Sequence, residues 1–233
     1  MARILSDASN LQVLYEDNHL IVINKRVGDI VQGDKTNDQP LSEIVKEYLK
    51  KKHNKPGAVF LGVIHRLDRP TSGLVIFAKT SKALKRMNQL FVDKKIDKTY
   101  WAVVKNLPPR ENDRLVHWLK KNPKTNTTKV YSKEVKDSKK AILNYRTILK
   151  LNNYILLEIA LETGRSHQIR SQLAYIGCPI KGDLKYGFSR SNTDGGIHLH
   201  AKKIQFTHPV SKHHISIDAP PPPNDLLWNE CLK

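Results

Sequence analysis

Cysteine and long apolar runs are both scarce in this sequence. Cys178 and Cys231 are its two cysteines, which are too few for a disulfide framework and lack the paired spacing of a metal site. No window is long and apolar enough to cross a bilayer, and residues 1–7 lack the apolar segment of a signal peptide. We therefore expect a reduced, cytoplasmic protein that is not embedded in a membrane.

Acidic residues are also few beside the basic ones. The 233 residues include 40 Lys+Arg and 22 Asp+Glu, which gives a formal net charge of +18. Such an excess repels itself, and a polyanionic partner relieves the repulsion. The basic residues recur at 46–55, 82–98, 120–140 and 202–212, which favours a broad basic face over a single tethering arm. A basic amphipathic helix with an aromatic anchor face is missing, so the charge favours nucleic acid over a membrane surface.

Hydrophobic alternation predicts more strands than helices. Strands are expected at 11–15, 19–24, 59–64, 74–78, 99–105, 141–149, 154–161, 203–206 and 214–217, the first two joined as a β-hairpin. Helices are expected at 40–52, at 81–91 with Ser81 as the cap, at 169–176 before Gly177, and near the C-terminus. The polar, basic stretch 106–140 predicts β-hairpins or an exposed insertion. Because the order has no regular βαβ rhythm, it predicts an α+β fold, in one domain since no linker or repeat divides the chain.

The most unusual stretch, 65–74, has the sequence HRLDRPTSGL and joins two predicted strands. Asp68 lies there between two arginines, in the kind of strand-supported loop where catalytic groups are often found. Neighbouring arginines favour the ionised carboxylate, which is the form that a nucleophile needs. The same residues also fit a structural Arg–Asp pair that holds the loop, and the chemistry alone leaves both interpretations open.

A second polar stretch, 162–170, has the sequence ETGRSHQIR and joins the end of a strand to the start of a helix. Arg165, His167 and Gln168 near a helix N-terminus suit the binding of a phosphate or a carboxylate. Ser166 also fits an ordinary helix cap, and the two interpretations are compatible.

Together with several other motifs, these two stretches resemble the RluA-type pseudouridine synthases. The resemblance includes 14–19, 23–25, 65–74, 98–100, 162–170, 177–180, 182–183, 186–187, 200–201 and 206–209. The motifs follow the order of the family over about residues 11–219, which makes the match far more specific than any single motif. The resemblance implies the pseudouridine synthase fold, a single catalytic domain over 1–233 with a mixed, largely antiparallel central sheet flanked by helices and loops.

The resemblance also implies roles for individual residues. It makes Asp68 the catalytic aspartate, Tyr100 the tyrosine that packs on the uracil ring, and Arg170 the basic residue that pairs with the aspartate. Arg66 matches an arginine that enters the RNA helix where the target base leaves. The expected RNA-binding set is completed by His65, Arg165, His167 and Gln168.

Pseudouridine formation breaks the N1–C1′ bond of uridine, turns the uracil and joins C5 to C1′. No electron leaves and no group is imported, so the resemblance implies no cofactor and no metal. An ionised Asp68 could attack C1′, or it could take the C2′ proton and drive elimination through a glycal, and the sequence does not choose. Flipping the target base out of a stacked RNA costs a few kcal/mol, which Arg66 would partly offset by filling the gap.

Two departures from the family pattern bear on RNA binding. Many relatives have Lys-Pro-x-Gly where this chain has Lys25-Arg26-Val27-Gly28, and the missing proline relaxes that turn. Because the family pattern begins near Leu11, we expect this chain to lack the small N-terminal RNA-binding domain of some relatives. We therefore expect the catalytic domain itself, acting as a monomer, to bind structured ribosomal or transfer RNA.

Three other interpretations compete with this one. His198, His200, His208, His213 and His214 invite a metal site, but no cysteine or carboxylate cluster completes a ligand set. A non-catalytic RNA-binding or ribosome-assembly protein fits the charge equally well, yet binding alone needs no buried carboxylate facing a polyanion. A glycosylase that releases uracil could use a similar aspartate, but the order of the family motifs disfavours it.

Overall fold

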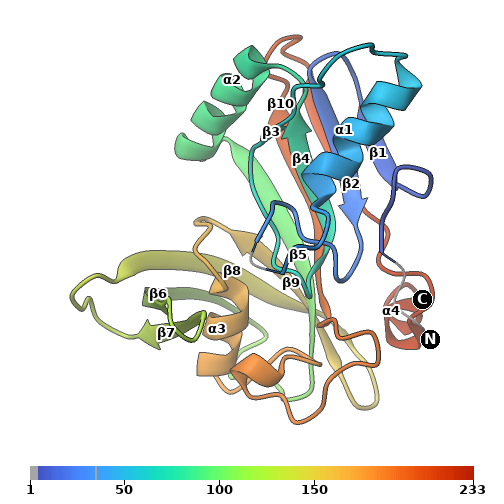
Figure 1. The fold of residues 1–233 in the computed structure, drawn as a ribbon. Helices are drawn as coiled ribbons and strands as arrows, with labels where there is room; N and C mark the ends of the chain where they lie inside the picture. The colour runs from blue at the N-terminus through green and yellow to red at the C-terminus, as the bar shows by residue number, and fades with distance from the viewer. Residues whose placement is uncertain (1–4, 35) are drawn as a thin grey trace. The chain divides into compact units, whose positions relative to one another are not determined.

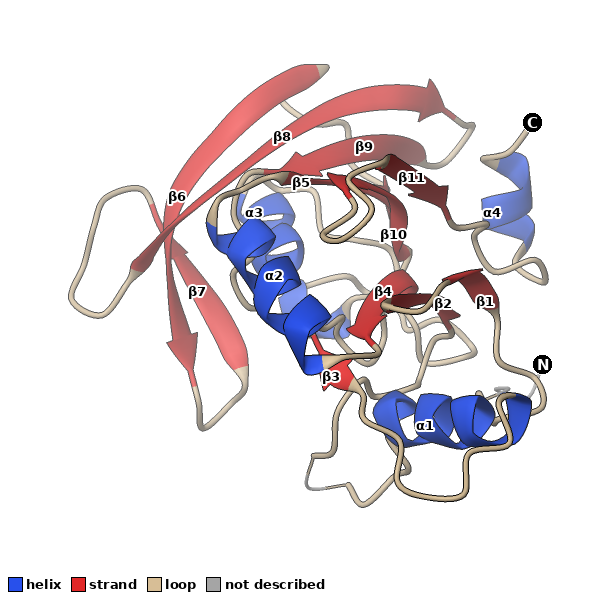
Figure 2. Cartoon of the chain, turned by 90° about the horizontal axis from the view of Figure 1, so that it is seen from above, coloured by secondary structure: helices blue, strands red, loops and turns tan. Residues whose placement is uncertain are grey.

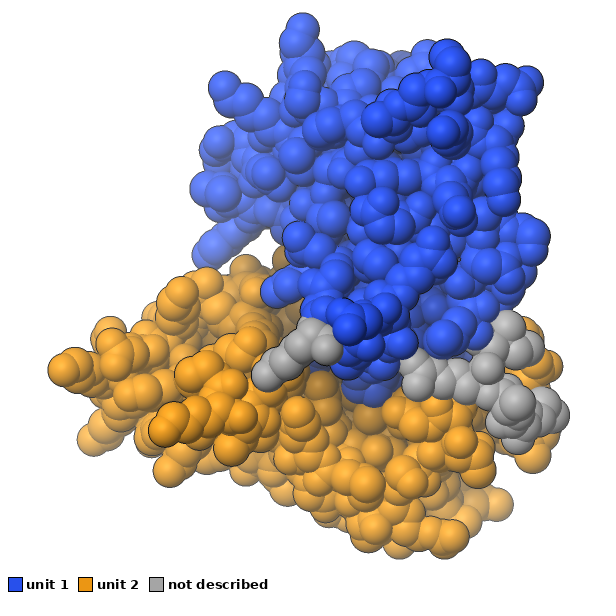
Figure 3. All heavy atoms as spheres, viewed as in Figure 1, with its two compact units in different colours: residues 1–97, 201–222 blue, residues 98–200, 223–233 orange. Residues whose placement is uncertain are grey.

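The computed structural model describes residues 5–34 and 36–233 (Figure 1). These residues divide into two compact units, each made of two stretches of chain. Unit 1 consists of the described residues among 1–97 together with 201–222, and unit 2 of 98–200 together with 223–233 (Figure 3). The single catalytic domain expected from the sequence stays a prediction.

Unit 1 is built on short strands. β2 pairs antiparallel with β1 and with β4, which confirms the expected hairpin near the start; β3 also pairs with β4, and β11 with β10. The strands of this unit are β1 (Val13–Glu16), β2 (Leu20–Lys25), β3 (Gly62–Val63), β4 (Ser72–Ala78), the later part of β10 (Leu199–Thr207) and β11 (His214–Asp218). Every residue of β2 and of β4 is buried, which explains why both strands read as nearly continuous apolar runs rather than alternating ones.

Two helices accompany these strands. α1 (Leu41–Lys52) contributes Leu41, Val45 and Leu49 to an apolar cluster with residues of β2 and β4, and it lies beside these strands in Figure 2. α2 (Ser81–Val92) begins after Thr80, whose hydroxyl accepts a hydrogen bond from the backbone N–H of the third helical residue. The expectation that Ser81 is the cap was wrong by one residue. Thr80 has the extended backbone (φ −139°) that a cap requires, whereas Ser81 is already helical.

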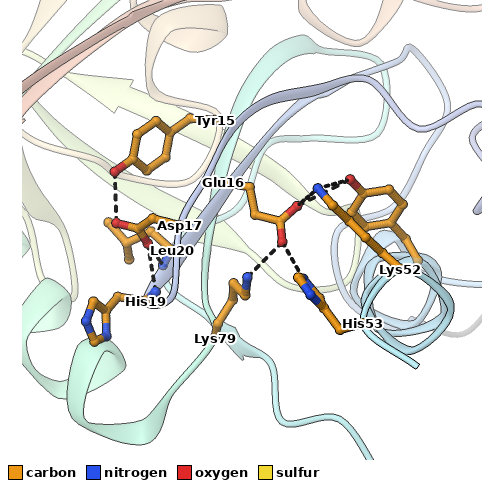
Figure 4. A network of polar contacts seen from close by, with 9 residues as sticks. Tyr15, Glu16, Asp17, His19, Leu20, Lys52, His53 and Lys79 are labelled. Atoms are coloured by element: carbon orange, nitrogen blue, oxygen red, sulfur yellow. Dashed lines mark hydrogen bonds and ion pairs between the residues drawn. The ribbon is translucent and has the colours of Figure 1, made fainter. Parts of the chain in front are cut away.

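One carboxylate at the end of β1 joins three elements of unit 1. Glu16, with a side chain 9% exposed, accepts hydrogen bonds from Lys79 Nζ and Lys52 Nζ and contacts His53 Nε2, each at 2.8 Å (Figure 4). Burial raises the pKa of Glu16, but the hydrogen bonds from these three residues outweigh it and lower the pKa to about 2. Lys79 directly follows β4, while Lys52 and His53 lie at the C-terminal end of α1. The ionised carboxylate of Glu16 therefore holds this helix to the strands.

Unit 2 contains the longest strands. β5 pairs with β9, β9 with β8, β8 with β6 and β6 with β7, all antiparallel. Its elements are most of β5 (Ile96–Val104), β6 (Asn112–Asn122), β7 (Thr127–Tyr131), β8 (Lys139–Lys150), β9 (Ile155–Leu161), α3 (Gln168–Tyr175), a 3-10 helix (Leu184–Tyr186) and α4 (Leu226–Glu230). The hairpin expected within 106–140 is confirmed by β6 and β7. At the end of the chain, α4 buries Trp228 in a cluster with Val103 and Leu156.

The fold is α+β, with a mixed, largely antiparallel sheet and few helices, as the sequence predicts. One strand is shorter than expected, because only Gly62–Val63 of the stretch 59–64 pairs. Val59 and Leu61 pack against the apolar cluster of α1, so their hydrophobicity reflects packing rather than strand pairing. Across the described residues, no helix combines the length and the apolar character needed to span a membrane.

Candidate active site

The loop that carries Asp68 joins β3 to β4 in unit 1. Asp68 is half-buried, and its carbonyl accepts a hydrogen bond from the Thr71 N–H at 3.0 Å, which closes a turn. The Arg69 guanidinium forms ion pairs with Asp34 and Asp38. Arg69 therefore ties the loop to Asp34 and Asp38, while the structural pair expected for Asp68 itself stays a prediction.

A buried lysine supports the backbone that follows Asp68. Lys25, at the end of β2, is 1% exposed. Its ammonium donates to the carbonyls of Thr71 at 2.6 Å, Arg26 at 2.8 Å and Arg69 at 3.2 Å. A charged donor bound to several carbonyls in a buried site fixes the path of the chain more firmly than neutral hydrogen bonds do. Lys25 therefore connects the turn at the end of β2 to the loop of Asp68.

Gly73, one residue into β4, allows a close approach of two strands. Its φ of +109° lies where side chains are strained, and a Cβ added there would lie 2.4 Å from the Ala201 carbonyl oxygen of β10. The glycine that ends the loop of Asp68 is thus required by backbone packing within unit 1.

The two residues that precede Leu67 have different settings. His65 is half-buried; its Nε2 accepts the Ile76 N–H at 3.1 Å, and its ring centroid lies 5.4 Å from that of Phe91. Because Nε2 accepts, the proton of the neutral ring is on Nδ1. This contact gives His65 a role in holding the loop to β4. Arg66 is exposed, which is the setting that a residue entering RNA requires.

Arg170 forms a two-point ion pair in unit 2. It lies in the first turn of α3 and is 5% exposed, and its Nε and Nη2 donate to the two carboxylate oxygens of Asp183 at 2.7 and 2.9 Å. Its Cζ also lies 5.1 Å from the ring centroid of Tyr186, within the range of a cation–π contact. A bidentate pair and a ring together determine both the position and the plane of the guanidinium.

Tyr186 links this ion pair to β7 and to the start of α3. Its hydroxyl accepts the Thr128 N–H at 2.8 Å and lies 2.8 Å from His167 Nδ1. Burial raises the pKa of Tyr186, so the hydroxyl stays protonated at neutral pH. His167 has a left-handed backbone (φ 52°) and occupies the cap position of α3 without a side-chain cap. The expectation that Ser166 is the cap was wrong, because the left-handed residue interrupts the helical path before Gln168.

Gln168 and Arg165 were both expected to contact RNA. The Gln168 side chain is 3% exposed; its Oε1 accepts from Thr163 Oγ1 at 2.8 Å and from the Arg165 N–H at 3.0 Å. Its Nε2 donates to the Ile142 carbonyl at 3.0 Å. The amide of Gln168 thus braces the turn, while the Arg165 side chain is exposed, with Nε donating to the Lys140 carbonyl at 3.1 Å. Contact of either residue with RNA stays a prediction.

The three expected catalytic residues come from both units. Asp68 belongs to unit 1, whereas Tyr100 and Arg170 belong to unit 2. Tyr100 lies on β5, is nearly buried and stands opposite Ile159 of β9. The pairing of Asp68 with Arg170 and the packing of Tyr100 on uracil stay predictions. Sequence reasoning missed the bracing residues Lys25, Asp183 and Tyr186, although each lies inside a motif that carries the family resemblance.

Three of the five histidines that invited a metal site have other contacts. His198 and His200 lie against Trp228, with ring centroids at 5.1 and 5.9 Å. His208 Nε2 lies 3.0 Å from an Asp17 carboxylate oxygen. Within the part of the chain that the structure describes, no group of three or more His, Cys, Asp or Glu is arranged to hold a metal ion.

Comparison with known proteins assigns the family. A family model described as RNA pseudouridylate synthase matches residues 19–175. Ribosomal large subunit pseudouridine synthase D of Zymomonas mobilis is 32% identical over 95% of this chain and 73% of its own. The chain belongs to the RNA pseudouridylate synthase family. Its branch is the RluA type, and members of this family are isomerases that convert uridine to pseudouridine in RNA.

Other relatives of this RNA pseudouridylate synthase differ in their named targets. An uncharacterised RNA pseudouridine synthase of Bacillus subtilis, YlyB, is 30% identical over 94% of this chain and 72% of its own. The tRNA pseudouridine synthase C of Vibrio cholerae is 28% identical over 95% of this chain and 94% of its own. The solved structure of human RNA Pseudouridylate Synthase Domain Containing 4 has the same fold, with a TM-score of 0.77 and 21% identity over 95% of this chain and 92% of its own.

Proposed function

We propose that this protein isomerises uridine to pseudouridine in structured ribosomal or transfer RNA, as a cytoplasmic monomer, with Asp68 as its catalytic carboxylate. The observation that carries the proposal is the loop of Asp68. Lys25 binds the carbonyls of Arg69 and Thr71, and Gly73 seats the end of the loop against β10. A catalytic group must be held close to its productive geometry, and a buried charged donor on the loop backbone supplies that restraint.

In this proposal, Asp68 begins the breaking of the N1–C1′ bond. As a nucleophile it would form a bond to C1′ while the N1 electron pair leaves with uracil. As a base it would instead remove the C2′ proton, leaving a glycal and the same uracil anion. In the first route C5 then attacks C1′ and displaces the Asp68 carboxylate; in the second C5 bonds to C1′ of the glycal while Asp68 returns the proton to C2′. Both routes end when C5 loses its proton and N1 gains one. Atoms and electrons balance within the nucleotide, so neither route needs a redox partner or an imported group.

Tyr100, Arg170 and Arg66 have supporting roles in the proposal. The ring of Tyr100 would retain the detached uracil while it turns. Arg170, oriented by Asp183, would keep Asp68 ionised and aimed. Arg66, which is exposed, would fill the space that the flipped base leaves in the RNA.

The names of the relatives support both RNA classes. Three relatives that are 32–33% identical act, by name, on the ribosomal large subunit, and two that are 26–28% identical act on tRNA. The experiment is therefore run on both. Bulk RNA with tritium at uridine C5 is prepared from cells that lack this protein and separated into ribosomal and transfer RNA. Tritium release into water is then followed with the full chain.

Asp68→Asn is the control, since it keeps the size of the side chain and removes its charge. We expect release by the wild type from one or both fractions, no release by the variant, and similar RNA binding by both proteins. Loss of binding together with activity would instead indicate a structural Asp68. Salt-sensitive binding without release from either fraction would favour a non-catalytic RNA-binding or ribosome-assembly protein.

A further inference from the structure

The basic stretch to which the family motifs assign no role folds as β6, β7 and the start of β8. Residues 112–140 include nine Lys or Arg and three Asp or Glu. They carry much of the positive charge of unit 2, on three strands of which β6 pairs with both β7 and β8. The placement of these charges within the sheet decides what they can bind.

Strand register places cations and aromatic rings on one face of this sheet. Trp118 of β6 stands directly opposite Tyr131 of β7 and Lys140 of β8, and Lys120 stands opposite Lys129. Directly opposed residues point to the same face, and residues two apart on one strand share it. These five residues therefore form one surface, which we call the hairpin face.

The hairpin face lies on the side away from the core. The residues that alternate with it include Leu119, which is 4% exposed, and Thr128, which is 6% exposed. β6 and β7 both contact α3, and Thr128 binds the Ser166 carbonyl before that helix. On the hairpin face itself, Lys129 and Lys140 are exposed. The hairpin thus has a core side and a solvent side, and the cations are on the solvent side.

Each aromatic ring of the hairpin face has an ammonium over it. Lys140 Nζ lies 5.7 Å from the ring centroid of Trp118, and Lys129 Nζ lies 5.3 Å from that of Tyr131. Both rings are partly exposed. Flat rings bordered by lysines are the arrangement on which proteins stack unpaired bases while they neutralise the neighbouring phosphates.

Lys120 and Lys129 are like charges placed directly opposite each other on neighbouring strands. Like charges directly opposite on a sheet destabilise it. Asp137 lies 3.5 Å from Lys120 Nζ, but its side chain is 69% exposed and that of the lysine 43%, so solvent screens this ion pair. A bound polyanion would relieve the repulsion between the two lysines, whereas a neutral or cationic partner would not.

We propose that the hairpin face binds unpaired RNA, with bases stacked on Trp118 and Tyr131 and phosphates beside Lys120, Lys129 and Lys140. Base-paired RNA would offer its phosphates to the lysines but keep its bases from the rings. The inference rests on the proposed function, since it takes the ligand to be RNA. It adds a second RNA-binding surface, separate in sequence from the Asp68 loop.

The test measures binding of a 15-nucleotide oligouridylate to the full chain by fluorescence anisotropy at several salt concentrations. A 15-base-pair duplex RNA serves as the comparison ligand. Each phosphate contact to a single strand contributes about 0.7 to the slope of log K against log salt. The variant Lys120→Gln/Lys129→Gln is expected to lower that slope by about 1.4. The matched control Lys50→Gln/Lys51→Gln removes the same charge from exposed positions on α1 and is expected to leave the slope unchanged.

The stacking part of the proposal is tested at Trp118. Trp118→Leu is expected to weaken oligouridylate binding about 10-fold and duplex binding little, because stacking one base contributes about 1–3 kcal/mol. Trp118→Phe keeps a ring and is expected to retain most of the affinity, and thermal unfolding of both variants checks that they fold.

Three results would overturn the proposal: an unchanged slope in the lysine variant, an equal loss in the α1 control, or equal weakening of duplex and oligouridylate binding by Trp118→Leu. Tritium release by the wild type is measured in parallel. If the wild type releases tritium but the variants bind RNA as the wild type does, the proposed function stands and only the proposal for the hairpin face is refuted. If the variants bind RNA more weakly but the wild type releases no tritium, the proposal for the hairpin face is supported and the proposed function is refuted.

Discussion

The buried polar sites and the hairpin face use charge in opposite ways. Lys25, Glu16 and Arg170 each have oppositely charged or carbonyl partners inside the chain, at 2.6 to 3.2 Å. On the hairpin face, Lys120 and Lys129 face each other across two strands. The first arrangement stabilises one backbone path, while the second leaves positive charge directed at solvent.

This difference separates residues that hold the protein from residues that contact its ligand. A charge buried with its partners costs several kcal/mol when one partner is removed, because the other is left unpaired in a poor solvent for ions. An exposed charge beside a like charge costs little or nothing to remove. The change in unfolding free energy on substitution should therefore differ between the two groups of residues. We expect large losses for the buried groups and small changes, or small gains, for the lysines of the hairpin face.

The largest effect is expected at Asp183. Asp183→Asn leaves the buried Arg170 guanidinium without its carboxylate, which should cost about 4 kcal/mol of unfolding free energy. It should also lower kcat about 100-fold with little change in KM, because a small displacement of a positioned group has effects of that size. Urea unfolding and steady-state tritium release measure the two changes.

Asp225→Asn is the matched control for this variant. Asp225 also lies in unit 2, where it accepts hydrogen bonds from the Leu227 and Trp228 N–H groups and pairs with His198. We expect this control to lose stability but to keep its kcat at a temperature where both variants are folded. If both variants lost kcat equally, Asp183 would be structural rather than a positioning residue.

A somewhat smaller loss is expected at Lys25. Lys25→Met keeps the length of the side chain but leaves the carbonyls of Arg69 and Thr71 without their donor. We expect a loss of about 3 kcal/mol, since buried acceptors deprived of a charged donor carry a desolvation penalty. Activity should fall with it, because these carbonyls belong to the loop of Asp68. Lys46→Met, at a partly exposed residue of α1 paired with Glu43 at 2.9 Å, serves as the control and should change stability by less than about 1 kcal/mol.

The lowered pKa of Glu16 predicts that the stability of the protein depends on pH. Its folded-state pKa of about 2 lies below its ordinary value of 4.5, so the ionised carboxylate stabilises the fold fully above pH 4.5. That contribution is lost as the pH falls from about 4.5 to about 2. Glu16→Gln should cost about 2 kcal/mol at pH 7, and the difference from the wild type should fall to less than half of that value by pH 3. Urea unfolding at pH 7, 5, 4 and 3 measures it, and a difference that stays constant over this range would contradict the assignment.

The smallest effect, and the one of opposite sign, is expected on the hairpin face. Lys129→Gln removes one member of the like-charged cross-strand pair and should raise the unfolding free energy by about 0.3 kcal/mol at low salt. The gain should disappear at high salt, which screens exposed charges. Thermal unfolding at two salt concentrations is sensitive enough if replicated. A clear loss of stability would mean that Lys129 stabilises the hairpin. The contrast between the buried polar sites and the hairpin face would then not hold at this residue.

Several elements were predictable because their determinants are local. The turn at Asp17, the apolar stripe of α1 and the apolar runs of β2 and β4 each lie within about ten residues of chain, and the structure has all of them. The length of β3 was overestimated. Apolar residues are buried both in strands and in loops that pack on a core, so the apolar stretch 59–64 does not show which of its residues pair with another strand. The cap of α2 was misplaced by one residue because threonine and serine are both good caps.

The sequence by itself determined the class of protein: a basic α+β chain whose ordered motifs place it among the RNA pseudouridylate synthases, with Asp68 as its expected catalytic residue. Only the tertiary structure decided which groups hold that machinery. It assigned Asp183 and Tyr186 to Arg170, Lys25 to the loop of Asp68, and five scattered residues of β6, β7 and β8 to one face. These partners come from different elements of the fold, and their pairing depends on strand register and burial, which no short stretch of sequence contains.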